Sequence, residues 1–308
     1  MIFKYKTLRR KPATFRAVTG LTPDEFDEYI EPLVLDLARQ ERERLERDDR
    51  RRAVGGGRSH DLHWRDQFLL TLVWLRLYPT YEVLGYFFGI SDTSAHRTVQ
   101  RCLSWLETTG RREIQRSQVH AARKRGYNLA AIFEQIPGLA VIVDAFEQQI
   151  ERPGSRQEAD KFYSGKKKQH TLKSQVGVDA YTGEVLDVAE SEPGRSQDKG
   201  TFNRSGTPER LPPDTAFMGD LGYPGLEKDL PLAAIPRKKP RNKPRPEEDI
   251  AFNTLFAQAR IVVEHTIAML RCYQALTARD RHHRQCHTQR VVAVAGLVNF
   301  RKRSRFVF

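Results

Sequence analysis

The sequence predicts an all-α N-terminal part followed by a mixed α/β domain. Apolar residues recur at helical spacing in most segments before residue 135, whereas short apolar runs typical of buried strands follow Pro137 and Gly138. Long helical patterns come after these strands, as in a mixed α/β fold. With 39% hydrophobic and 30% charged residues, the composition is that of a folded protein and excludes a wholly disordered or collagen-like chain.

The first long helix is predicted over residues 23–45. Thr22 precedes it as a cap, and acidic residues occupy its first turn. The charged run after this helix ends in three glycines at 55–57, which indicates a solvated helix end and a flexible hinge. One face of the helix carries an apolar stripe, interpreted either as a contact between two copies of the chain or as packing on the chain's own helices. The stripe consists of Phe26, Ile30, Leu33 and Leu37.

Residues 62–106 are predicted to form three helices. Pro79 stops the helix Trp64–Leu77, the helix Tyr81–Phe88 ends at Gly89, and Ser91 caps the third. A short helix, a glycine turn and a polar third helix are typical of a helix-turn-helix, whose third helix enters the major groove of DNA. A purely structural three-helix bundle is the alternative. The polar face of the third helix supplies the predicted DNA contacts Thr93, Ser94, His96, Arg97, Gln100 and Arg101.

The second half of the chain is predicted to alternate strands with helices. A basic helix over 111–135 precedes it. Tyr181, Thr182 and Gly183 indicate a turn between the second and third strands. Strands are predicted at Leu139–Val143, Gln169–Asp179, Glu184–Glu190, Ala216–Met218 and Leu232–Ile235, and helices at Phe252–Tyr273 and Thr288–Arg301.

Basic residues outnumber acidic residues by 52 to 39, a formal charge of +13, so nucleic acid is the default partner. Pro236–Pro246 holds six Lys or Arg among four prolines and is predicted to be an exposed basic loop. A second basic segment flanks a strand, and strand alternation would place Lys166, Lys168 and His170 on one face; a merely solvated strand edge is the alternative. The predicted phosphate contacts are Lys166, Lys167, Lys168, His170, Lys173, Arg237, Lys238, Lys239 and Arg241.

Three acidic residues are candidate catalytic groups. Asp144 and Asp220 each follow a buried strand, at the rim of the sheet where α/β enzymes collect polar groups; a turn-capping Asp is the alternative. Glu264 lies mid-helix opposite the apolar stripe, where a surface ion-paired Glu would look the same. Because Mg²⁺ prefers hard oxygen ligands and leaves positions open for phosphate oxygens, the three carboxylates predict a site for two Mg²⁺ ions, with Mn²⁺ as a substitute.

Two further groups of polar residues are candidates for a functional role. Arg195 and Asp198 lie in one loop and either assist the acidic site or form a loop turn. The Cys and His residues between 272 and 287 lack the paired Cys-x-x-Cys spacing, so zinc is not predicted there. The three cysteines are scattered, and neither a signal peptide nor a membrane span is evident, which predicts a soluble cytoplasmic protein with no membrane partner.

Four motifs resemble the DDE transposases of bacterial insertion sequences, a group related to the Harbinger-type transposases. The resemblance spans essentially the whole chain. It implies a ribonuclease H-like catalytic core preceded by a helix-turn-helix domain, with Asp144, Asp220 and Glu264 matching the catalytic triad. Family members commonly carry a small residue and then Thr after the first Asp, where this chain has Ala145 and Phe146. The motifs are Asp144–Pro153, Tyr163–Lys173, Gly219–Pro224 and Ala259–His265.

The resemblance implies three domains and a function. The domains are an N-terminal helical segment and hinge over 1–57, a helix-turn-helix DNA-binding domain over 58–135, and a ribonuclease H-like catalytic domain over 136–308. The expected enzyme is associated with the bacterial nucleoid, binds the terminal inverted repeats of its element as a homodimer or higher oligomer, cleaves the double-stranded DNA and transfers the freed strand to target DNA. The alternatives are a domesticated, non-catalytic DNA-binding regulator and a metal-dependent nuclease without strand transfer.

Overall fold

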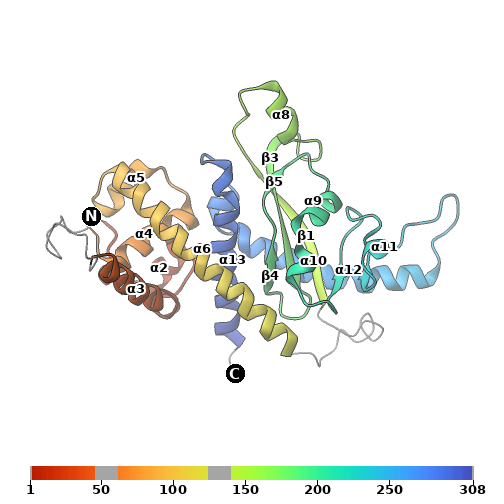
Figure 1. The fold of residues 1–308 in the computed structure, drawn as a ribbon, viewed down its shortest axis with the longest axis horizontal. Helices are drawn as coiled ribbons and strands as arrows, with labels where there is room; N and C mark the ends of the chain where they lie inside the picture. The colour runs from red at the N-terminus through yellow and green to blue at the C-terminus, as the bar shows by residue number, and fades with distance from the viewer. Residues whose placement is uncertain (1, 46–61, 124–139, 307–308) are drawn as a thin grey trace. The chain divides into compact units, whose positions relative to one another are not determined.

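The computed structural model describes residues 2–45, 62–123 and 140–306 (Figure 1). The chain divides into two compact units. The helical unit comprises Met1–Thr108, Tyr273–Ala275 and Arg303–Phe308, and the sheet unit comprises Thr109–Cys272 and Leu276–Lys302. None of the helices described in these ranges combines the length and apolar character that crossing a membrane requires.

The helical unit contains the predicted first helix with the predicted bounds. Its cap is reciprocal: the Glu25 N–H donates to Thr22 Oγ1 at 3.1 Å, and the Thr22 N–H donates to Glu25 Oε2 at 2.7 Å, which satisfies two backbone donors at the helix start. The sequence did not indicate the two short helices that precede it. The helices of this unit are α1 (Tyr5–Leu8), α2 (Pro12–Thr19), α3 (Pro23–Leu45), α4 (Trp64–Leu77), α5 (Tyr81–Phe88) and the start of α6 (Asp92–Arg123).

The apolar stripe of α3 is buried within the chain itself. Phe26, Ile30, Leu33 and Leu37 are at most 5% exposed, and the ring of Phe26 lies 5.3 Å from that of Tyr5 in α1. The interpretation of this stripe as a contact between two copies is therefore wrong, because these side chains already form part of the core of one copy.

The predicted helices at 64–77 and 81–88 are confirmed as α4 and α5. Gly89 adopts the left-handed conformation with φ 65°, and Ser91 caps α6 by accepting the Ser94 N–H at 3.1 Å. The sequence suggested separate helices on either side of Gly110, but α6 runs through it. A Cβ at this position would lie 2.4 Å from the Val292 carbonyl oxygen, so Gly110 allows α6 and α13 (His287–Phe306) to approach closely.

The sheet unit contains a mixed sheet in the order β2-β3-β1-β6-β7, with β4 and β5 also paired to β3. The central strand β1 is antiparallel to β3 and parallel to β6, and β6 is parallel to β7. The predicted mixed α/β architecture is confirmed. The strands are β1 (Ala140–Gln149), β2 (Tyr163–Ser164), β3 (Gln169–Asp179), β4 (Val185–Val188), β5 (Glu192–Pro193), β6 (Ala216–Met218) and β7 (Ala233–Ala234).

Helices lie along the sheet (Figure 1). Val141 and Val143 of β1 join a core cluster with Phe202 and Leu226 from two of the short helices. Because successive side chains of a strand point to opposite faces, Asp144 projects to the other face, where it meets α12 through Arg260. The helices of this unit, besides the end of α6 and most of α13, are α8 (Arg156–Phe162), α9 (Asp198–Ser205), α10 (Thr207–Arg210), α11 (Leu226–Asp229) and α12 (Glu247–Arg271).

Two predicted C-terminal helices are present with changed starts. α12 begins at Glu247, five residues before the predicted start, because Glu247, Glu248 and Asp249 favour the positive end of the helix dipole. α13 begins at His287, one residue early. Two short 3₁₀ helices, Gln274–Leu276 and Arg284–Cys286, connect them.

His287 is fully buried at the start of α13. Its Nε2 lies 2.7 Å from Gln148 Oε1, and its Nδ1 lies 2.8 Å from Ser191 Oγ. The Gln148 amide nitrogen donates to the Ala278 carbonyl, so Oε1 accepts and His287 Nε2 carries the proton. Burial and, to a lesser extent, the charge of Arg290 lower the pKa of His287 to about 3, while the charge of Asp280 acts in the opposite direction. This histidine is therefore neutral in the folded protein at neutral pH.

The buried neutral histidine makes stability fall in acid. At pH values between about 3 and the ordinary pKa near 6.5, this histidine is protonated in the unfolded chain but not in the folded chain. As the pH is lowered through this range, the free energy of unfolding should thus decrease by up to about 1.4 kcal/mol per pH unit from this group alone. Urea unfolding of wild type and His287→Gln between pH 7 and 4 measures the difference; a difference that does not change with pH would contradict the expectation.

Candidate active site

Asp144 lies in the middle of β1 rather than at its end. The strand continues to Gln149, paired throughout with β3, whereas its pairing with β6 stops at Ile142 opposite Met218. The sequence placed the strand end at Asp144 because the apolar run stops there; the antiparallel partner β3 extends it. Beyond Ile142 β6 no longer pairs with β1, which leaves Asp144 at an edge.

Asp144 and Asp220 each lie two residues beyond a paired position of the neighbouring parallel strands β1 and β6. Asp144 is two residues beyond Ile142, and Asp220 is two residues beyond Met218, the register partner of Ile142. Burial raises the pKa of Asp144, and the nearby charges of Asp220 and Asp198 raise it further; the Ala145 N–H and Arg260 act in the opposite direction. The two aspartates therefore meet at one edge of the sheet, close enough to interact electrostatically.

The turn after β6 holds Asp220 in place. Its Oδ1 accepts the Gly222 N–H at 2.7 Å, and its carbonyl accepts the Tyr223 N–H at 3.1 Å. A Cβ on Gly222 would lie 2.8 Å from Asp220 Oδ1 and 2.7 Å from Asp198 Oδ2. Those two carboxylate oxygens are thus no more than 5.5 Å apart (2.8 + 2.7), and only glycine fits between them.

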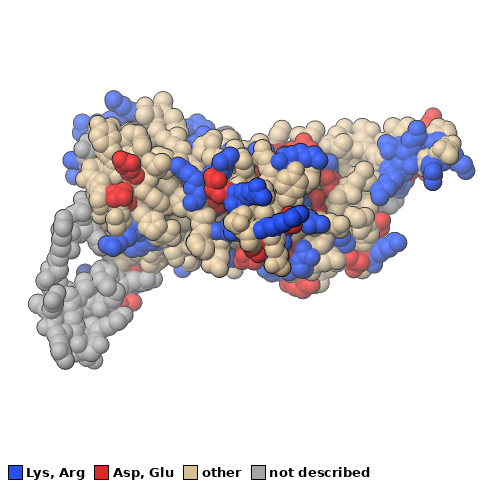
Figure 2. Space-filling view, turned by 90° about the horizontal axis from the view of Figure 1, so that it is seen from above, with Lys and Arg blue, Asp and Glu red and all other residues tan. Residues whose placement is uncertain are grey.

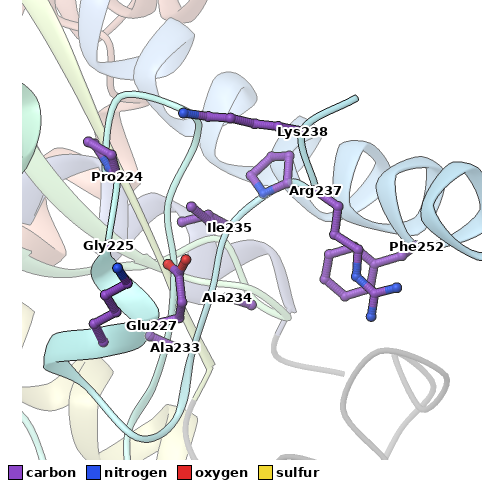
Figure 3. A pocket seen from close by; sticks show the side chains of 11 residues that line it. Pro224, Gly225, Glu227, Ala233, Ala234, Ile235, Arg237, Lys238 and Phe252 are labelled. Atoms are coloured by element: carbon purple, nitrogen blue, oxygen red, sulfur yellow. The ribbon is translucent and has the colours of Figure 1, made fainter. Parts of the chain in front are cut away.

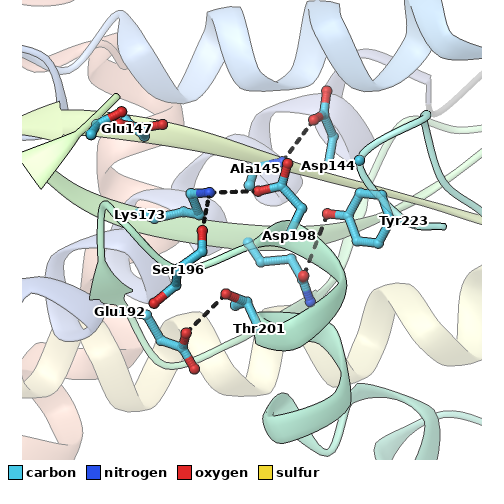
Figure 4. A network of polar contacts seen from close by, with 12 residues as sticks. Asp144, Ala145, Glu147, Lys173, Glu192, Ser196, Asp198, Thr201 and Tyr223 are labelled. Carbon is cyan, nitrogen blue, oxygen red and sulfur yellow. Dashed lines mark hydrogen bonds and ion pairs between the residues drawn. The ribbon is translucent and has the colours of Figure 1, made fainter. Parts of the chain in front are cut away.

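Asp198, which the sequence left undecided, belongs to this acidic group. Its Oδ1 accepts from Lys173 Nζ at 2.7 Å, and the same ammonium donates to the Ser196 carbonyl at 2.5 Å (Figure 4). Lys173 is 7% exposed, so the ammonium predicted to contact DNA phosphate is instead engaged with Asp198. In the sequence, the only sign of a role for Asp198 was the loop motif. The sequence could not show that a lysine of β3 contacts it.

Glu264 approaches the aspartates from α12. Arg260, one turn earlier, has Nη2 3.6 Å from Glu264 Oε1 and 3.6 Å from Asp144 Oδ2. Glu264 is 58% exposed and Asp144 is 20% exposed at the side chain. The guanidinium therefore links the exposed glutamate of the helix to the half-buried aspartate of the strand.

The three predicted carboxylates suit a divalent ion by their chemistry, because carboxylate oxygens are the ligands that Mg²⁺ prefers. Asp144 and Asp220 lie together, and Glu264 is joined to Asp144 through Arg260. Among the residues that the structure describes, no group of three or more His, Cys, Asp or Glu side chains is arranged so that it could hold a metal ion. The donors suit an ion by their chemistry, and Arg260 is ion-paired with both Asp144 and Glu264.

The predicted contacts on α6 differ in their surroundings. Thr93, His96 and Arg97 are exposed. Ser94 is bonded to the capping Ser91, and Arg101 donates to Gln67 and lies over the Trp64 ring. Of the predicted contacts, those three residues and the half-exposed Gln100 are therefore accessible from solvent.

The basic segment before β3 is a turn, so the predicted alternation of Lys166 and Lys168 is wrong. Residues 165–168 connect β2 to β3, Lys168 has φ 56°, and its N–H donates to the Ser164 carbonyl at 2.8 Å. A turn replaces the strand because β2 and β3 form a hairpin at this point. The three lysines of the turn, 166–168, are exposed.

The proline-rich segment forms the expected exposed loop, and Lys and Arg gather on it at one end of the sheet unit (Figure 2). Lys238, Lys239 and Arg241 are exposed there. Arg237 is anchored: it pairs with Asp249 at 3.0 Å and lies 4.6 Å from the Phe252 ring. Arg237, Lys238 and Phe252 line a cavity of about 540 Å³ beside the turn that follows Asp220 (Figure 3).

Comparison with known proteins agrees with this geometry. Residues 143–299 match the family described as DDE superfamily endonuclease, and residues 60–112 match the helix-turn-helix of DDE superfamily endonuclease. A relative from Microchaete diplosiphon, named "Probable transposase for insertion sequence element IS702", is 28% identical over 252 residues, which cover 82% of this chain and 86% of the relative. No solved structure matches the chain. The endonuclease match spans just over half of the sequence, and the chain belongs to the DDE superfamily of endonucleases.

Proposed function

We propose that this endonuclease is a transposase that cleaves DNA at the ends of its element and joins the freed 3′-hydroxyl to target DNA. The observation that carries the proposal is the placement of Asp144 and Asp220, each two residues beyond the last paired position of β1 and β6, with Glu264 on α12 linked to Asp144. The similarity to a relative named as a probable transposase for an insertion sequence supports it. The relation to Harbinger-type transposases stays a prediction.

Endonucleases of this superfamily generally depend on divalent metal ions. We infer that Asp144, Asp220 and Glu264 hold two Mg²⁺ ions, with Mn²⁺ as a substitute. Bound ions of this kind supply activation of an attacking hydroxyl and stabilisation of the leaving oxygen. The protein itself contributes orientation: the Gly222 N–H holds Asp220, and Lys173 holds Asp198 beside it.

DNA binding follows from the helix-turn-helix and endonuclease matches. We propose that the exposed face of α6 reads the terminal inverted repeats, because an exposed polar face on a third helix suits base edges in the major groove. The turn at residues 166–168 and the basic loop at 236–246 supply charges for phosphates without reading sequence. Specificity and affinity would thus come from different parts of the chain.

This division predicts two kinds of binding defect. Arg97→Ala and Gln100→Ala should each reduce the preference for terminal-repeat DNA over scrambled DNA by about 10-fold to 100-fold, since a base contact is worth about 1–3 kcal/mol. The double change Lys238→Ala with Lys239→Ala should weaken binding to both duplexes alike. The slope of log binding constant against log salt concentration should become shallower by about 2, because about two phosphate contacts are lost. Competition binding at several salt concentrations measures both; an unchanged preference in the α6 variants would place end recognition elsewhere.

A strand-transfer assay tests the function directly. A labelled duplex that carries the terminal repeat is incubated with the whole protein, Mg²⁺ and a supercoiled plasmid. Joined product is the expected result. Cleavage without joining would instead identify a nuclease that lacks strand transfer, and repeat-specific binding without cleavage would identify a DNA-binding regulator.

Two element ends must be joined to one target, and each chain carries a single set of three acids, so we infer that the working complex contains at least two copies. The contact between copies lies outside the α3 stripe, which is buried in one copy. Light scattering with and without terminal-repeat DNA measures the stoichiometry, and a one-to-one complex that joins both ends would contradict a dimer.

A further inference from the structure

Arg260 lies between two of the carboxylates that we propose as metal ligands. Its Nη2 is 3.6 Å from Asp144 Oδ2 and 3.6 Å from Glu264 Oε1. Both contacts are ion pairs rather than tight hydrogen bonds, because direct N–H···O distances cluster near about 2.9 Å. The guanidinium therefore bridges the two carboxylates without being locked to either.

The charges around this arginine do not balance. Four carboxylates are opposed by two cations, which leaves a formal charge of 2 − 4 = −2. Lys173 is already bonded to Asp198 and to a carbonyl, so Arg260 is the cation placed against the other acids. The carboxylates are Asp144, Asp198, Asp220 and Glu264, and the cations are Lys173 and Arg260.

We propose that Arg260 occupies, in the metal-free enzyme, the place that a divalent cation takes between Asp144 and Glu264, and that it swings away when the site is loaded. The inference rests on the proposed metal-binding role of the triad. It explains why the carboxylate donors suit an ion by their chemistry while the described residues show no group arranged around one. Loading requires a side-chain movement of one residue on α12, with no change in the sheet.

The arginine must leave by rotation, because a guanidinium keeps its proton throughout the physiological pH range. The pair with Glu264 is screened by water, because the side chain of Arg260 is 29% exposed and that of Glu264 is 58% exposed. A cation with twice the charge then competes favourably for the same oxygens.

Metal binding without DNA tests this competition. Mn²⁺ affinity of the whole protein is measured by isothermal titration calorimetry and by the electron paramagnetic resonance signal of free Mn²⁺. Arg260→Met should bind Mn²⁺ about five-fold to ten-fold more tightly than wild type, because it removes a competing charge. Arg260→Gln, a second neutral variant, should show the same gain, and Arg260→Lys, which keeps the charge, should return the affinity toward the wild-type value.

Arg271→Met provides the matched control. It removes the same charge from an exposed position of the same helix and should leave Mn²⁺ affinity unchanged. Circular dichroism melting of each variant verifies that it is folded. A general effect of net charge would appear in Arg271→Met as strongly as in Arg260→Met and would overturn the inference.

The remaining outcomes separate this inference from the function it rests on. Unchanged or weaker Mn²⁺ binding in both Arg260→Met and Arg260→Gln would overturn the role of Arg260 as a competitor, while the triad would stand. Wild-type protein that binds no Mn²⁺, or Asp220→Asn that binds it as wild type does, would instead overturn the proposed triad.

Discussion

Asp144→Asn, Asp220→Asn and Glu264→Gln are each expected to lower Mg²⁺-dependent DNA cleavage by more than about a thousandfold while DNA binding survives. Each change replaces a charged oxygen ligand by a neutral amide of the same shape, and the loss of several kcal/mol of charge stabilisation in the transition state corresponds to that factor. Binding survives because the basic loop and α6 are untouched. Single-turnover cleavage of terminal-repeat DNA and a gel-shift titration measure the two properties.

Asp160→Asn is the control for these variants. Asp160 is an exposed carboxylate on α8, so its loss changes the net charge equally and should leave cleavage unaltered. Undiminished cleavage by any of the three triad variants would reject that residue as a ligand. Joint loss of cleavage and binding would point to unfolding, which a melting curve detects.

The second large effect concerns stability. Asp280 and Arg290 form an ion pair in which both side chains are 1% exposed, and the Asp280 N–H donates to the Gln149 carbonyl at the end of β1 at 2.7 Å. Arg290→Met leaves the Asp280 carboxylate buried without its main cation, which should lower the free energy of unfolding by about 3–5 kcal/mol. The melting temperature should fall by about 10 °C.

Two further variants test whether the loss of stability comes from leaving a buried charge unpaired. Arg279→Met removes the cation of the exposed pair with Glu151 and should cost less than about 1 kcal/mol. Asp280→Asn combined with Arg290→Met removes both charges and should recover part of the loss. A single Arg290→Met variant as stable as wild type would contradict the role of the pair.

Most secondary structure followed from local patterns. The bounds of α3, α4 and α5 and of the strands β3 and β6 were predicted from caps, prolines, glycines and apolar spacing, because such signals act within a few residues. Local patterns did not predict element ends that depend on a segment distant in the sequence. β1 extends past its apolar segment because β3 pairs with it. α6 continues through Gly110, where α13 packs against it.

The site shows the same limit. The sequence pointed to Asp144 and Asp220 because each follows an apolar run, but it could not show that the two runs are neighbouring parallel strands, paired up to Ile142 and Met218. It also counted Lys173 among the DNA contacts. In the fold this residue is buried and bonded to Asp198 at the start of α9, since β3 and α9 meet only in the tertiary structure.

The sequence by itself determined the helical and α/β parts, the basic character of the chain and the three acids, because turn chemistry, apolar period and charge are properties of neighbouring residues. Only the tertiary structure decided which charges face one another: Asp198 with Lys173, and Arg260 with both Asp144 and Glu264. These pairs join residues from separate strands, loops and helices, and Coulomb interactions depend on distance in space rather than on separation along the chain.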